Sequence, residues 1–150
     1  MLTIHAADEV RHDWDGAALK DGAVVVEGGR IAAVGTLADL RDRFPTARVR
    51  NWPGVLGPAR VHDGPLPDAP SPRERVHEVL KLGATAVLER YADTAELRAA
   101  AERNDVAVLR GTTARTPVLV VTGRADLAVF DVAGACIATV CAGRLVHRRK

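Results

Sequence analysis

The residues with the clearest potential for chemistry are His62 and Asp63, in the segment VLGPARVHDG at residues 55–64. A histidine and an aspartate that follow an apolar stretch ending in Gly57-Pro58 are typical of a metal-binding or acid–base turn. A hydrolytic zinc ion usually has three protein ligands, however, and adjacent side chains of an extended chain point in opposite directions. We therefore interpret His62 and Asp63 as an exposed polar turn, and keep them only as weak candidates for a metal site.

Other polar residues give no catalytic pattern. No nucleophile lies at a recognisable spacing from a histidine or lysine base, so we predict no catalytic residue and no cofactor. Gly28-Gly29 lies between two strand-like runs and not before a helix, which argues against a phosphate-binding loop. The remaining candidates are a polar loop with His12, Asp13 and Asp15, two aspartates at strand ends (Asp126 and Asp131), and the threonines Thr112, Thr113 and Thr116.

The two cysteines, Cys136 and Cys141, are five residues apart in one strand-like run, CIATVC. This spacing predicts that their side chains point to opposite faces of the strand. We therefore expect neither a disulfide between them nor a zinc site, and interpret both as small apolar residues.

Composition excludes several classes of protein. The chain has 150 residues, of which 47% are apolar and 27% charged, as expected for a globular domain with a core. A net charge of +2, scattered basic residues and five aromatic residues argue against nucleic-acid binding. No apolar run is long enough to span a membrane, and the N-terminus does not resemble a signal peptide. We expect a cytoplasmic protein.

The elements that must position these residues begin with a β-rich region. Residues 2–6 are predicted to form a strand, and residues 22–35 a hairpin that pairs the strand at 23–27 with that at 30–34 across Gly28-Gly29. A short helix should follow Thr36 and end at Pro45, before a further strand at 47–52.

The middle of the chain has a different pattern. Six prolines between residues 53 and 72 indicate an irregular crossing. Ser71-Pro72 with Glu74 predicts the start of a helix that ends at Gly83, and the run DTAE at 93–96 predicts the start of another. With apolar strands at 84–89 and 106–109, this region reads as one βαβ unit.

The last third returns to short strands. They are expected at residues 117–121, 125–131, 136–140 and 144–148, at spacings typical of hairpins. We therefore predict a mainly β fold with an α/β insert. Residues 1–57 and 117–150 should form one composite β-sandwich or partly open barrel, and residues 58–116 the insert.

Three segments resemble a known family. VVVEGGRIAAVG (24–35), ARVRNWPG (47–54) and GRADLAVFDVAGACIATVCAGRLV (123–146) are similar to the composite β-domain of the amidohydrolase superfamily, closest to imidazolonepropionase-like enzymes. The resemblance implies a β-domain built from both ends of the chain. It also implies a metal-dependent barrel between them that hydrolyses non-peptide C–N bonds.

The chain departs from that family at its metal site. The family's Asp-x-His-x-His segment falls on Val61, Asp63 and Pro65 of this sequence, with His62 one position out of place. The insert has fewer than sixty residues, whereas a (β/α)₈ barrel takes about 250. We interpret the turn as the remainder of a lost metal site, attached to a remnant of the barrel.

Three functions are compatible with the sequence. The first is a non-catalytic amidohydrolase-like protein that acts by binding or assembly. The second is a small C–N hydrolase with a relocated site, and the third is a small-molecule-binding protein with a pocket between the insert and the β-part. We also expect a twofold homodimer, because the apolar strands at 84–89 and 106–109 leave edges without charged residues, with Val87 in the contact.

Overall fold

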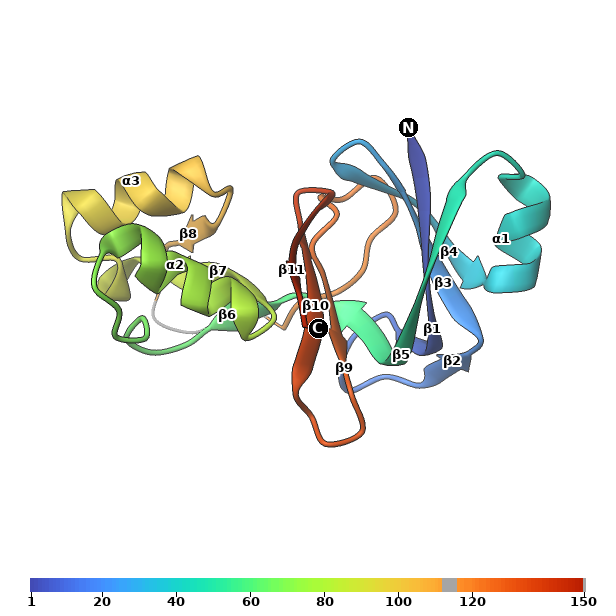
Figure 1. Ribbon diagram of the computed structural model, residues 1–150, viewed down its shortest axis with the longest axis horizontal. Coiled ribbons are helices and arrows are strands. Elements are labelled where there is room, and N and C mark those ends of the chain that lie inside the picture. Colours follow the sequence, from blue (N-terminus) through green and yellow to red (C-terminus); the bar gives the residue numbers. More distant parts are fainter. Residues whose placement is uncertain (112–115, 150) are drawn as a thin grey trace.

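The computed structural model describes residues 1–111 and 116–149, which form a curled β-sheet with a smaller α/β unit packed against it (Figure 1). The large sheet is ordered β11-β10-β9-β5-β1-β3-β4, and β2 pairs with the end of β1. Its strands are β1 (Leu2–Arg11), β2 (Ala18–Lys20), β3 (Gly22–Glu27), β4 (Arg30–Thr36), β5 (Arg48–Pro58), β9 (Leu127–Phe130), β10 (Cys136–Cys141) and β11 (Arg144–Arg148). Both ends of the chain therefore contribute to one sheet, which confirms the predicted mainly β composite fold.

The two halves of the sheet are joined by β5. This strand pairs in parallel with β1 on one side and antiparallel with β9 on the other. The predicted hairpin is also confirmed, since β3 and β4 pair antiparallel.

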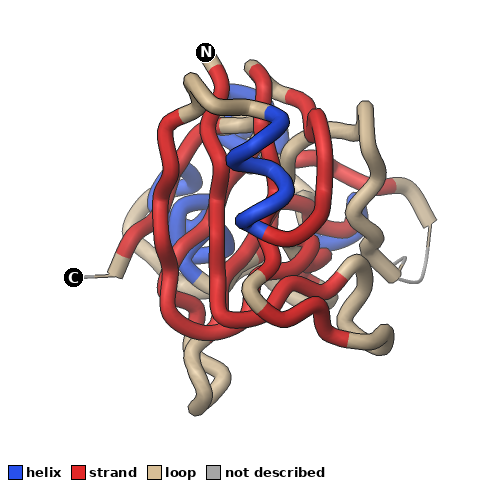
Figure 2. The backbone as a smooth tube through the Cα atoms, turned by 90° about the vertical axis from the view of Figure 1, so that its right-hand side faces the viewer, coloured by secondary structure: helices blue, strands red, loops and turns tan. Residues whose placement is uncertain are grey.

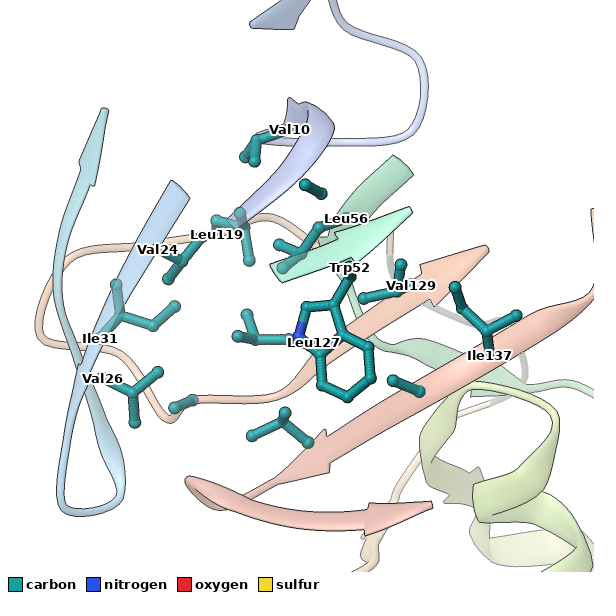
Figure 3. Packing of buried hydrophobic residues seen from close by; sticks show 14 residues of the cluster. Val10, Val24, Val26, Ile31, Trp52, Leu56, Leu119, Leu127, Val129 and Ile137 are labelled. Carbon is teal, nitrogen blue, oxygen red and sulfur yellow. The ribbon is translucent and has the colours of Figure 1, made fainter. Parts of the chain in front are cut away.

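The main core lies inside the curl of the sheet (Figure 3). Trp52 and Leu56 of β5 lie between residues of β1, β3 and β4 on one side and of β9 and β10 on the other. Strands distant in the sequence thus share a single buried interior. The largest contributors from those strands are Val10, Val24, Val26, Ile31, Leu127, Val129, Ile137 and Val140.

The opposite face of β1, β3 and β4 is covered by α1 (Leu37–Arg43), which crosses the strands in Figure 2. Thr36 caps this helix, and its hydroxyl accepts a hydrogen bond from the backbone N–H of Asp39. Leu40 is the fully buried residue of the helix and packs on Ile4 and Val25. The short helix predicted between Thr36 and Pro45 is therefore present.

The insert is larger than one βαβ unit. It consists of β6 (Arg60–His62), α2 (Pro72–Lys81), β7 (Ala84–Leu88), a 3₁₀ turn at Glu89–Tyr91, α3 (Ala95–Arg103) and β8 (Ala107–Leu109). The strands form a parallel sheet ordered β6-β7-β8. The sequence analysis did not identify β6, which has three residues between Pro58 and Gly64.

Helix starts in the insert follow the predicted caps. The hydroxyl of Ser71 accepts a hydrogen bond from the N–H of Glu74, and that of Thr94 accepts one from the N–H of Leu97. The apolar sides of both helices pack on one face of the small sheet, where Val79, Val87 and Leu97 are buried. None of the helices of the described residues is long and apolar enough to cross a membrane. The cytoplasmic location stays a prediction.

Three local predictions were wrong. Residues 117–121 form no strand, although Leu119 is buried and its N–H donates to the carbonyl of His12. The segment 55–64 is no turn, because β5 continues to Pro58 and His62 ends β6. β7 has no free edge, because it lies between β6 and β8 and buries Val87 completely. Val87 therefore cannot form the expected dimer contact.

The prediction that the two cysteines point to opposite faces of the strand is wrong because of a β-bulge. The pairing of β10 with β9 shifts between Cys136 and Ala138, so side chains beyond the bulge change face. The thiol of Cys136 lies 3.3 Å from the Thr139 hydroxyl, which itself donates to the carbonyl of Leu80 in α2 at 2.7 Å. Cys141 is buried in the core of the insert. Both thiols are free and lie on the face of β10 that packs against the insert.

Candidate functional site: the cleft between the insert and the β-sheet

The predicted weak candidates, His62 and Asp63, lie at the carboxyl end of β6. The Nε2–H of His62 donates to the carbonyl oxygen of Pro65 at 2.9 Å. The carboxylate of Asp63 lies 3.8 Å from the guanidinium of Arg90, which follows β7. Each side chain therefore has a structural partner, and the two do not converge on one point.

The carboxyl ends of parallel strands are where α/β folds normally bind ligands. Here they carry exposed ion pairs, Asp63 with Arg90 and Glu89 with Arg110 at 3.9 Å. Exposed pairs of this kind contribute about 0–1 kcal/mol. In the part of the chain that the structure describes, no three His, Cys, Asp or Glu side chains are grouped closely enough to hold a metal ion.

The other polar groups singled out in the sequence have local roles. Asp13 accepts a hydrogen bond from the N–H of Asp15 at 3.0 Å, within the polar loop after β1. Asp126 lies just before β9 and binds Arg124 at 2.9 Å. Thr112 and Thr113 lie outside the described residues, and Thr116 is exposed.

Asp131 ends β9 as predicted, and it organises the hairpin that leads to β10. Its carboxylate accepts hydrogen bonds from the backbone N–H groups of Ala135 and Ala133, and from Arg149 at 2.9 Å. The bond from Ala135, followed by that from Arg149, lowers the pKa of Asp131. The hairpin that forms one wall of the cleft described next is therefore fixed by an ionised aspartate.

An open cleft of about 560 Å³ lies between the insert and the large sheet. One wall comes from β6 and from the turn between α2 and β7, and the other from the end of β9 and the hairpin before β10. The polar and charged side chains that line it are Arg60, His62, Asp63, Lys81, Cys136 and Arg149. A pocket between insert and β-part was the location expected for a binding site.

Arg60 and Phe130, which both line the cleft, form a cluster with the side chain of Trp14. The guanidinium of Arg60 lies over the ring of Phe130, 4.1 Å from its centroid, and 5.2 Å from that of Trp14. The two rings meet edge to face at 5.3 Å, and the indole N–H of Trp14 donates to the carbonyl of Pro58 at 2.8 Å. The exposed Arg60 side chain thus packs against both aromatic residues.

Sequence reasoning missed all three of these residues. Phe130 was predicted only as part of the strand at 125–131, and no role was predicted for Trp14 or Arg60. Two of only five aromatic residues in the chain are used in this stack. That scarcity was the one signal in the sequence that could have drawn attention to them.

Cys136 is the only thiol that lines the cleft within the described residues. Burial raises the pKa of this thiol above its ordinary value, and the hydrogen bond with Thr139 opposes that shift only in part. The nucleophilic form of cysteine is the thiolate. The thiol of Cys136 is therefore held in its neutral form.

The hairpin β3–β4 with the helix that follows it is the segment that a known family model describes. Residues 22–47 match the bacterial imidazolonepropionase-like composite domain. The resemblance drawn from the segment 24–35 is thereby confirmed. No curated protein matches the chain.

Solved structures share the composite-domain fold over most of this chain. The adenosine deaminase of Xanthomonas campestris, with bound zinc, is 24% identical with a TM-score of 0.55, over 71% of this chain and 33% of its own. The E. coli guanine deaminase is 16% identical with a TM-score of 0.54, and the similarity covers 75% of this chain and 36% of the deaminase. The ochratoxinase of A. niger is 21% identical with a TM-score of 0.51, and the similarity covers 73% of this chain and 30% of the ochratoxinase.

These similarities describe the fold. The chain spans about a third of the length of the solved structures that it matches. It therefore has the composite β-domain found in these hydrolase-related proteins, and a three-stranded insert at the position where the resemblance implies a barrel.

Proposed function

We propose that this chain is a non-catalytic, amidohydrolase-like protein that binds a small molecule in the cleft between the insert and the large sheet. The observation that carries this proposal is the cleft itself, in which a stacked arginine faces an open volume of about 560 Å³. Ligand pockets of this kind typically have volumes of about 300–1,000 Å³ and are often found where two structural units meet.

The absence of catalysis is supported by what occupies the carboxyl ends of β6 to β8. In the resembling family the metal ligands come from such strand ends. Here Asp63 and Pro65 stand at the family's two histidine positions and Val61 at its acidic position, and Asp63 pairs with Arg90. Three strands also leave the small sheet open and not closed into a ring.

Two measurements test the proposal. We expect purified protein to contain no stoichiometric transition metal and to turn over no hydantoin, imidazolone or cytosine-like substrate. A metal at one per chain together with turnover that is lost in His62→Ala would support the alternative, a small C–N hydrolase with a relocated site. Thermal-shift screening against a panel of metabolites tests binding, and no stabilising compound from that panel would contradict it.

We also propose that two copies assemble around a twofold axis through β8. Within the described residues the outer edge of β8 pairs with no strand, and Ala107–Leu109 carries no charge. The neighbouring segment exposes Val118, Val120 and Val121 to about half of their surface. Edge strands with apolar neighbours are normally paired or covered. Light scattering that gives a mass of 16.0 kDa would refute the dimer.

A further inference from the structure

The charges in the cleft do not cancel. Lys81 is paired with Glu78 at 3.2 Å, and Arg149 with Asp131 at 2.9 Å. Arg60 is different, since no carboxylate of residues 1–111 or 116–149 lies within ion-pair distance of its guanidinium. Arg60 therefore provides the cleft with a positive charge that the described part of the chain does not neutralise.

This charge also packs against aromatic rings. The guanidinium of the exposed Arg60 lies 4.1 Å from the centroid of the Phe130 ring and 5.2 Å from that of Trp14, which is itself anchored to Pro58. A guanidinium that packs over an aromatic ring keeps its N–H donors free for other partners. A planar arginine of this kind can donate two parallel hydrogen bonds to one carboxylate or phosphate group.

The rest of the cleft suits a ligand with an apolar part. Leu82, at the end of α2, is half exposed, and Val61 and Phe130 line the same volume. Gly83 has φ of +84°, and a Cβ there would lie 2.7 Å from the ring of Phe130. The glycine thus lets the turn between α2 and β7 approach the sheet closely and form the floor of the cleft.

We infer that the cleft binds small oxyanions that carry an apolar group, with the carboxylate or phosphate held by Arg60. The inference rests on the proposed binding function and names the class of ligand. Carboxylate and phosphate share the chemistry that Arg60 recognises, so probes of both kinds are needed to tell them apart.

The experiment is a titration of the full-length, ¹⁵N-labelled chain followed by NMR. The probes are benzoate, phenyl phosphate and inorganic phosphate, with uncharged benzamide as the matched control. We expect benzoate, phenyl phosphate or both to shift the Nε–H signal of Arg60 and the amide signals of Gly134 to Cys136. Benzamide should bind at least about tenfold more weakly, as expected when a charge-assisted hydrogen-bonded pair is lost.

Variants separate the roles of charge and geometry. Arg60→Met should weaken oxyanion binding about tenfold or more, and Arg60→Lys should restore it only in part because lysine lacks the planar fork. Arg41→Met, an exposed arginine on α1, is the matched control and should bind as the original chain does. If Arg60→Met does not fold, the Nε–H signal of Arg60 in the unaltered chain still shows whether this side chain contacts the probe.

The possible failures are distinguishable. Equal binding of benzamide and benzoate at the cleft amides would overturn the oxyanion inference and leave the binding function intact. Unchanged affinity in a folded Arg60→Met would overturn it as well. If none of the probes shifts a cleft signal, the oxyanion inference is wrong, and the thermal-shift panel decides the binding function independently.

Discussion

His5 is expected to make the fold sensitive to mild acid. It lies in the middle of β1, with 3% of its surface exposed, and its Nδ1 accepts a hydrogen bond from the indole N–H of Trp52 at 3.2 Å. Burial, and to a lesser extent the charge of Arg50, lower the pKa of His5 from about 6.5 to about 4. Arg148, whose guanidinium lies 5.5 Å from the Trp52 ring, adds a second positive charge nearby.

The direction and size of the effect follow from these values. Between about pH 6.5 and about pH 4 the unfolded chain binds a proton at His5 and the folded chain does not, so stability falls as the pH is lowered through that window. Since one pH unit corresponds to 1.36 kcal/mol, the loss attributable to His5 is about 3 kcal/mol at most. This is a large share of the typical free energy of unfolding of a small domain, about 5–15 kcal/mol.

The assay is urea unfolding at a series of pH values, followed by far-ultraviolet circular dichroism. His5→Asn keeps an acceptor for the indole of Trp52 but cannot be protonated, so its stability should depend less on pH across this window. His12→Asn, at an exposed histidine, is the matched control and should keep the pH dependence of the original chain. If the original chain and His5→Asn lose stability in parallel, a neutral buried His5 is not the cause.

Three further outcomes are expected. Thr139→Val removes the hydroxyl that donates to the carbonyl of Leu80, and it should lower the free energy of unfolding in urea by about 1–2 kcal/mol. An unchanged midpoint of the urea transition would mean that this hydrogen bond does not hold the insert to the large sheet. Ser71→Ala should cost about 1 kcal/mol in the same assay, because α2 loses its cap, and no loss would contradict that role. Val118→Lys should weaken the proposed dimer, measured by light scattering, whereas Val132→Lys, at a fully exposed hairpin position, should not. If both variants weaken the dimer equally, the dimer contact lies elsewhere.

The features that the sequence predicted correctly are those encoded locally. The hairpin of β3 and β4 depends on two β-branched runs around Gly28-Gly29, and Gly28 has the positive φ, +60°, that such a turn needs. The caps Ser71 and Thr94 act on N–H groups three residues away. In each case the residues that decide the structure are neighbours in the chain.

Predictions that depend on distant partners were less successful. Residues 117–121 are a short apolar run like those of buried strands, yet backbone hydrogen bonds in that stretch are few and the chain stays irregular. The three residues of β6 are too few to give a pattern, and they form a strand because β7 lies beside them. The bulge in β10, which brings both cysteines to the insert face, has no signature in CIATVC.

The binding site illustrates the same limit more strongly. His62 and Asp63 drew attention because of their residue types, but the structure gives them separate partners. Arg60, two positions earlier, gains its properties from Phe130 and Trp14, which come from opposite ends of the chain. No spacing rule connects these three residues, because only the composite sheet brings them together.

The way in which the insert is attached explains why the cleft lies where it does. The N–H of Arg60 donates to the carbonyl of Gly83 at 2.9 Å, which ties β6 to the turn before β7. Thr139 holds the end of α2 against β10, and Gly83 leaves room for Phe130 at the point of closest approach. These contacts join the first residues of β6 and β7 to each other and α2 to the large sheet. The carboxyl ends of the same strands are paired through His62 and Val87 and are bordered by exposed ion pairs. Because a binding site needs walls that do not move relative to one another, these contacts suit the junction to hold a ligand, and His62 and Asp63 at the end of β6 belong to the same lining.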